Sequence, residues 1–145
     1  MSGYSHILLA VDFSKNIETV AEQALALSKA FGAGISLVHI VEFVQVDLSN
    51  ELVLPQEAEL DQQLMALAEK RLNEFGERYG IGDSDRIICQ GSTRKEILRI
   101  AEEKNVDLIV IGSHGRQGIQ LLLGSTANAV LHGAPCDVLA VRIRD

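Results

Sequence analysis

Residues 106–115 read Val106-Asp107-Leu108-Ile109-Val110-Ile111-Gly112-Ser113-His114-Gly115, an aliphatic run that ends in two glycines. The aliphatic residues from Val106 to Ile111, interrupted only by Asp107, predict a strand that is buried on both faces, as in a parallel sheet. A second glycine group, Gly124-Ser125-Thr126, follows after eight intervening residues and opens a segment with helical spacing. The stretch therefore predicts a strand, a glycine-containing loop and a helix in succession.

The composition of this loop is typical of an anion-binding site. Glycines let backbone amides approach a ligand without side-chain obstruction, and a helix that begins at Gly124 points free N–H groups and its positive dipole end at that ligand. The same glycines also suit an ordinary turn, and Ser125 suits a helix cap, so the residues alone leave both interpretations open. The loop is not the dinucleotide fingerprint, which requires G-x-G-x-x-G after the first strand of a unit. It is not a P-loop either, since no Lys precedes Ser125-Thr126.

Strands and helices are predicted to alternate along the whole chain. The predicted strands cover residues 7–11, 35–41, 86–90, 106–111 and 137–143, and the predicted helices cover residues 17–31 and 56–79, a segment that begins at 93, and residues 124–132. This alternation predicts an α/β fold with right-handed crossovers and one open parallel sheet, in a single domain over residues 1–145. Ligands of such sheets bind beyond the carboxyl ends of the strands, where Asp12 would face the glycine loop if the first and fourth strands are neighbours.

Composition excludes several classes of partner. The chain has 145 residues, 47% of them hydrophobic and only 4% aromatic, which predicts an aliphatic core of ordinary size. The formal net charge of −7 argues against binding to nucleic acid or to an acidic membrane surface. Because the sequence shows neither a signal peptide nor an apolar run long enough to span a membrane, we expect a cytoplasmic protein.

The reactive side chains form no recognisable catalytic or metal-binding pattern. Cys89 and Cys136 form no C-x-x-C pair, and we expect both to be buried, reduced thiols. His39 lies inside an apolar strand and is expected to be a core residue, and no pair of histidines has metal-ligand spacing. Ser14 has no His and Asp partners at hand, so we assign no catalytic residue and no metal site.

Two local patterns complete the analysis. Thr93 and Glu96 match a capping box at the start of a helix. Residues 42–55 mix apolar and acidic side chains without a period, and a loop of this length in a small domain predicts a flap or a surface for a partner.

With these elements placed, the chain resembles the universal stress protein family over its whole length. The resembling blocks are Ile7-Leu8-Leu9-Ala10-Val11-Asp12-Phe13-Ser14, Leu37-Val38-His39-Ile40, Val106 to Gly115, Gly124-Ser125-Thr126 and Pro135-Cys136-Asp137-Val138-Leu139-Ala140-Val141. The resemblance implies a Rossmann-like, open five-stranded parallel sheet of order 3-2-1-4-5 with helices on both faces. It also implies a homodimer paired along the C-terminal strand, which would lie at a sheet edge open to another strand.

One branch of that family binds ATP through G-x-x-G, nine residues, then G-(S/T). Carried over, the resemblance implies that the nucleoside contacts are Ala10, Val11, Asp12 and Ile40. It implies that ribose and phosphates, with Mg²⁺ accompanying the phosphates, are surrounded by Gly112, Gly115, Gly124, Ser125 and Thr126. Asp12 could instead cap the first helix together with Ser14. His114 could touch the ligand or only order the loop, and Arg116 could clamp a phosphate or remain solvated.

This chain departs from that pattern by one residue, since eight residues and not nine separate Gly115 from Gly124. We expect the nucleoside half of the site to tolerate the change, and AMP or ADP to fit better than ATP. The resulting hypothesis is an adenine-nucleotide-binding protein of a stress response, with slow ATP hydrolysis or autophosphorylation at most. The alternatives are a nucleotide-independent homodimeric interaction protein and a true ATPase.

Overall fold

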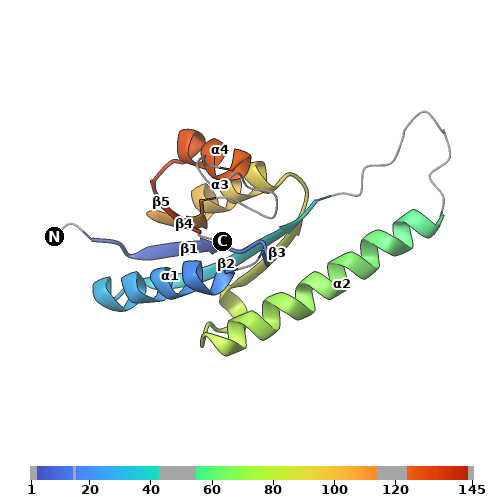
Figure 1. Ribbon diagram of the computed structural model, residues 1–145, viewed down its shortest axis with the longest axis horizontal. Coiled ribbons are helices and arrows are strands. Elements are labelled where there is room, and N and C mark those ends of the chain that lie inside the picture. Colours follow the sequence, from blue (N-terminus) through green and yellow to red (C-terminus); the bar gives the residue numbers. More distant parts are fainter. Residues whose placement is uncertain (1–2, 15, 43–54, 114–123, 144–145) are drawn as a thin grey trace.

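The computed structural model describes residues 3–14, 16–42, 55–113 and 124–143. These residues form an α/β sandwich with helices on both faces of one sheet (Figure 1). The strands are β1 (His6–Ala10), β2 (Gly34–Val41), β3 (Arg86–Gln90), β4 (Leu108–Gly112) and β5 (Asp137–Val141). The helices are α1 (Ile17–Phe31), α2 (Pro55–Arg78), α3 (Thr93–Glu103) and α4 (Ser125–Gly133), with one 3-10 turn, Asp83–Asp85, before β3.

The sheet has five parallel strands in the order β3-β2-β1-β4-β5, which confirms the predicted order. β1 is the central strand, and Ile7 pairs with Ile35 of β2 on one side and with Leu108 of β4 on the other. The chain winds outward from β1 to β3 and then returns to β4, so the direction of winding reverses between β1 and β4. A ligand site is expected at that reversal.

Side chains of β1 alternate between two core layers. Ile7 and Leu9 pack on the side of α1 and α2, whereas Leu8 and Ala10 pack on the side of α3 and α4 (Figure 1). This alternation follows from the two-residue period of a strand. Because both faces are covered by helices, the buried part of the strand, residues 7–10, needs aliphatic side chains, and the predicted aliphatic core is confirmed.

Two strands are shorter than predicted, and local hydrogen bonds explain both differences. Val106 was expected in the fourth strand, but its amide donates to the Ala101 carbonyl and closes the end of α3. Ile143 was expected in the fifth strand, but its amide donates to Ser113 Oγ beyond the end of β5. Aliphatic composition alone does not distinguish a strand from a buried connection.

The interpretation of Asp12 and Ser14 as caps of the first helix is wrong. Asp12 Oδ1 accepts a hydrogen bond from the Ser14 amide at 3.0 Å and so closes a turn before the helix. Asn16, in the left-handed region at φ 68°, precedes α1 instead. The Ser14 hydroxyl is buried and has no hydrogen-bond partner among the described residues.

The capping box at Thr93 is also wrong. The residue before α3 is Ser92, and Thr93 is already the first helical residue. The Thr93 hydroxyl donates to Glu42 Oε1 at 2.7 Å, and the Glu96 carboxylate pairs with Arg99. The Thr93 side chain therefore binds a distant residue just after β2 and does not cap its own helix.

Helix α2 is longer than the sheet edge that it covers. Its later turns bury Ala68, Leu72 and Phe75, while its amino-terminal part projects past the sheet (Figure 1). Leu64 and Leu67 in that part remain 36% and 46% exposed. No helix among the described residues is long and apolar enough to cross a membrane.

The cysteines are less buried than expected. Cys89 and Cys136 are both half-buried and form no disulfide. Burial raises the pKa of each thiol above its ordinary value.

At the amino end of the sheet, Asp107 joins β1 to the start of β4. Its carboxylate accepts hydrogen bonds from the backbone amides of Ser5 and His6 at 2.8 and 3.0 Å. Desolvation raises the pKa of Asp107, but these amide hydrogen bonds lower it more, so its pKa in the folded protein lies below 3.8.

We expect Asp107→Asn to lower stability near neutral pH by about 1 kcal/mol, a charged hydrogen-bond contribution discounted for partial exposure. Because the folded-state pKa is depressed, this contribution is present above pH 3.8 and is lost as the pH falls through the lower folded value. Thermal denaturation between pH 7 and pH 2 checks this. The two proteins should converge in acid, and Asp85→Asn, which changes an exposed carboxylate, should match the parent throughout. Equal melting points of parent and Asp107→Asn at pH 7 would contradict it.

Candidate functional site

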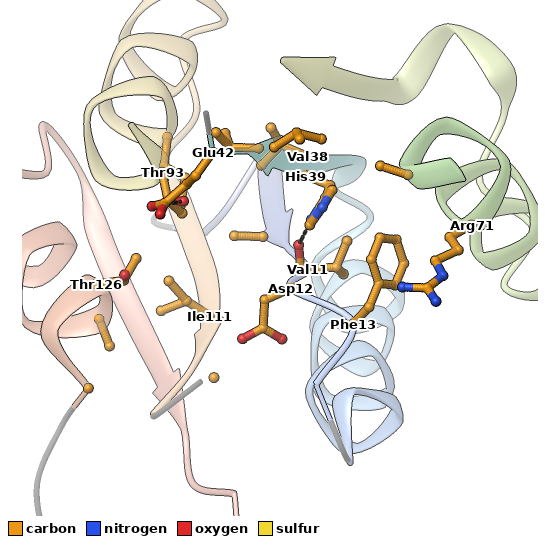
Figure 2. Close-up of a pocket in the computed structure, with 18 of the residues that line it drawn as sticks. Val11, Asp12, Phe13, Val38, His39, Glu42, Arg71, Thr93, Ile111 and Thr126 are labelled. Carbon is orange, nitrogen blue, oxygen red and sulfur yellow. Dashed lines mark hydrogen bonds between the residues drawn. The ribbon is translucent and has the colours of Figure 1, made fainter. Parts of the chain in front are cut away.

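A cavity lies at the carboxyl edge of the sheet, where β1 and β4 diverge (Figure 2). We call it the edge cavity; its volume is about 770 Å³, within the usual range for small-molecule sites. The structure brings together in its lining eight of the residues that the sequence predicted for a ligand site. They are Ala10, Val11, Asp12, Ile40, Gly112, Gly124, Ser125 and Thr126.

Three further predicted contacts, His114, Gly115 and Arg116, lie outside the described residues. Residues 43–54, within the segment predicted to be a flap, also lie outside them. The described part of the edge cavity therefore comprises the strand ends, the start of α4 and one face of α2.

Asp12 stands at the centre of the edge cavity, because it is the second residue after the central strand. One carboxylate oxygen is used by the Ser14 amide, which orients the group. Figure 2 shows the carboxylate directed into the space between Ile111 and Phe13. The arrangement offers a fixed hydrogen-bond acceptor to a ligand hydroxyl or amine.

Ser113 joins the end of β4 to the two elements that follow it. Its amide donates to the Val141 carbonyl at 2.8 Å, and its carbonyl accepts from the Gly124 amide at 2.7 Å. Gly112, just before it, has a packing role as well: a Cβ there would lie 2.6 Å from Ile143 Cδ1. The start of α4 is thus held beside the end of β4.

Helix α4 begins with backbone donors that no side chain among the described residues caps. Gly124 is the N-cap residue, so the interpretation of Ser125 as the cap is wrong. The first helical bond here runs from the Asn128 amide to the Gly124 carbonyl, which leaves the amides of the first turn without partners inside the helix. These amides and the helix dipole favour an anion at this point of the edge cavity.

His39 is not the core residue that its apolar strand predicted. It is half-buried, lines the edge cavity, and its ring Nδ1 lies 2.6 Å from the Val11 carbonyl oxygen (Figure 2). Since a carbonyl can only accept, Nδ1 carries the proton in this contact. The ring also packs against Phe13, with 4.6 Å between centroids.

Three polar or aromatic site residues that follow the strands were not predicted from the sequence. The edge cavity is lined by Phe13, Glu42 and Thr93. The Thr93–Glu42 hydrogen bond joins the first residue of α3 to the residue that follows β2 (Figure 2). Their positions just after predicted strands were a usable signal, because parallel strands end at one edge.

The contribution of α2 to the edge cavity was also not predicted, and no local sequence pattern indicates it. Leu64, Leu67 and Arg71 line the edge cavity from the helix face that projects beyond the sheet. The point at which the helix crosses the sheet edge depends on tertiary packing, and this decides which of its residues line the edge cavity.

Comparison with known proteins agrees with this fold. The sequence model described as the universal stress protein family matches residues 3–142. Universal stress protein A homolog 2 of Coxiella burnetii is 41% identical over 145 residues, covering 99% of each chain.

Solved structures agree as well. Universal stress protein UspA from Lactobacillus plantarum superposes with a TM-score of 0.81 at 23% identity, covering 99% of this chain and 100% of that one. A universal stress protein in complex with cAMP superposes with a TM-score of 0.68 at 22% identity, covering 99% of each. The sequence matches and the shared strand order together show that the chain belongs to the universal stress protein family.

Proposed function

We propose that this protein binds an adenine nucleotide in the edge cavity and serves a cytoplasmic stress response as a nucleotide-dependent regulator. The observation that carries the proposal is the meeting of Asp12, Gly112 and the uncapped start of α4 at the reversal of winding. A carboxylate acceptor and a helix amino terminus in one cavity suit a ligand with sugar hydroxyls at one end and phosphate at the other.

The nucleoside would occupy the side of the edge cavity that faces α3 and α4. Its walls there are aliphatic and come from three strands and a helix: Ala10, Ile40, Ile97 and Ile111. A flat base removes apolar surface from water against such walls. Asp12 Oδ2 then accepts from a ribose hydroxyl, while Oδ1 keeps its hydrogen bond with the Ser14 amide.

The phosphates would lie at the start of α4. Ser125 and Thr126 present backbone amides there, and their hydroxyls add donors, while Gly124, whose amide donates to Ser113, leaves room for the phosphate because it has no side chain. Mg²⁺ would arrive with the phosphates of ADP or ATP. The shortened loop between Gly115 and Gly124 supports a preference for AMP or ADP.

The relative that was solved with cAMP supports an adenine nucleotide as the ligand class, since its chain shares this fold over 99% of its length. We propose binding and not rapid turnover as the function. Asp12 is engaged with the Ser14 amide, and the His39 Nδ1 proton is engaged with the Val11 carbonyl, so ATP hydrolysis or autophosphorylation would be slow.

Nucleotide binding should raise the melting temperature. At a ligand concentration of one hundred times Kd the stabilisation is about 2.7 kcal/mol, which corresponds to roughly 10 °C for a domain of this size. Thermal denaturation with AMP, ADP and ATP, each with and without Mg²⁺, measures it, with inorganic phosphate as the control. If no nucleotide at millimolar concentration shifts the transition, the protein is instead a nucleotide-independent interaction protein.

Asp12→Asn should weaken AMP binding about tenfold or more, because a charged hydrogen bond to the ribose is lost. The amide oxygen can still accept from the Ser14 amide, so the melting temperature of the ligand-free protein should stay within a degree or so of the parent. Calorimetric titration with AMP gives the affinity. Asp85→Asn, an exposed carboxylate at the opposite end of the sheet, is the matched control. Unchanged AMP affinity in Asp12→Asn would show that Asp12 does not contact the nucleotide.

We also propose that two copies pair along β5. This strand is at one edge of the sheet, and its only described strand neighbour is β4. Val138, Leu139 and Ala140 are half-buried, which leaves an aliphatic edge able to accept a strand from a second copy.

Light scattering should give twice the chain mass of 15.8 kDa. Leu139→Lys places a charge on this edge and should yield the monomer, as charged edge strands resist pairing. Ile88→Lys is the matched control, because Ile88 is equally half-buried but lies on β3, the opposite edge. Circular dichroism checks that both variants fold. A parent protein that is monomeric at high concentration would contradict pairing along β5.

A further inference from the structure

The edge cavity extends across the sheet edge onto the side of α1 and α2, where the proposed nucleotide has no contacts. We call this part the α2 lobe; it is lined by Phe13, His39, Leu64, Leu67, Ala68 and Arg71. Figure 2 shows Phe13, His39 and Arg71 on one side of Asp12, and Ile111 and Thr126 on the other. The two parts of the edge cavity therefore offer different chemistry to a ligand.

The wall of the α2 lobe is apolar, although it is open to solvent. Leu64 and Leu67 lie three positions apart on α2, on the same helix face as Ala68 and Arg71. Leu64 and Leu67 keep 36% and 46% of their surface exposed, while Ala68, one residue further on, is buried. An apolar wall over a cavity favours an apolar ligand group, which would remove that surface from water.

Phe13 is held over the α2 lobe by an unfavourable backbone conformation. Its φ is 57°, in the left-handed region that bulky side chains rarely adopt. The ring packs between His39 and Phe75, at 4.6 and 6.2 Å between centroids. Strained backbone of this kind is often found at ligand sites.

Arg71 supplies the polar end of the α2 lobe. Of the described residues that line the edge cavity, it is the one Lys or Arg, and no ion pair or hydrogen bond joins it to another described residue. Figure 2 shows the Phe13 ring between the Arg71 guanidinium and the Asp12 carboxylate. A guanidinium beside leucines matches a ligand with a carboxylate head and an aliphatic tail.

We propose that the α2 lobe binds an aliphatic carboxylate, a fatty acid of short or medium chain, with its head on Arg71 and its tail along Leu64, Leu67 and Phe13. This site is separate from the proposed nucleotide contacts, so carboxylate binding can be tested independently of the proposed function.

Titration of the ¹⁵N-labelled protein with octanoate, followed by NMR, tests the site. We expect saturable shifts of the backbone amides of Phe13 and of residues 64–71. Arg71→Gln should raise Kd about fivefold, the effect of losing roughly 1 kcal/mol of charge pairing. Arg78→Gln, an exposed arginine on the same helix, should leave Kd unchanged. Octan-1-ol, which has the tail without the charge, should bind more weakly to the parent protein.

A second pair of variants tests the contact between the aliphatic tail and the leucines of α2. Leu67→Asp should abolish the octanoate shifts, and Leu131→Asp, which alters a leucine on α4 that is 45% exposed, should retain them. Absence of saturable shifts, shifts centred on Ser125 and Thr126, or an equal loss in Arg78→Gln would overturn the proposal. So would conversion of a dimer to a monomer by Leu67→Asp, which would assign this face to a second copy. AMP titrations run in parallel show whether nucleotide binding fails independently.

Discussion

The central strand β1 is buried on both faces and paired on both edges, and the positions of the other elements depend on it. Ile7, Leu8 and Leu9 are fully buried. Their burial contributes roughly 5–9 kcal/mol as an upper estimate, comparable to the whole net stability of a small domain. A polar side chain at any of these positions would have no water and no partner, so the strand tolerates only aliphatic residues.

The same constraint places the edge cavity. With β1 in the centre, the chain must leave it on one side for β2 and return on the other for β4, and the two exits diverge at the carboxyl edge. Ser113 then holds the end of β5 and the start of α4 beside the end of β4, since its backbone binds both Val141 and Gly124. Asp12 and the start of α4 face the same space because both are connected to this pair of strands.

The two sides of the sheet edge differ in chemistry because different helices cover them. On the side of α3 and α4, the edge cavity combines aliphatic walls with helix amides and the Thr93–Glu42 pair. On the side of α1 and α2, a helix longer than the sheet leaves leucines and Arg71 over the opening. One cavity therefore presents donors for anions in two forms, backbone amides on one side and a guanidinium on the other.

The sequence by itself determined the elements and the residues at the strand ends. Aliphatic runs and helical spacing located the five strands and four helices, most within one or two residues of their observed bounds, because burial imposes these periods directly. Asp12 and Gly112 could be assigned to one cavity because they lie at or just beyond the carboxyl ends of parallel strands, which meet at one edge, whereas Ile40 was assigned through the family resemblance. The strand order itself came from the family resemblance, since periodicity carries no information on which strands are neighbours.

Only the tertiary structure decided the partners of individual side chains. Thr93 and Asp12 both match local capping patterns, yet Thr93 binds Glu42, just beyond the end of the distant strand β2, and Asp12 closes a turn. Arg71 and Leu67 reach the edge cavity through the angle at which α2 crosses the sheet, which no local pattern encodes. The physical reason is the sequence distance over which each effect operates. The hydrophobic period of a helix or strand relates residues a few positions apart, whereas hydrogen-bond partners and the crossing angles of helices depend on contacts between segments far apart in the chain.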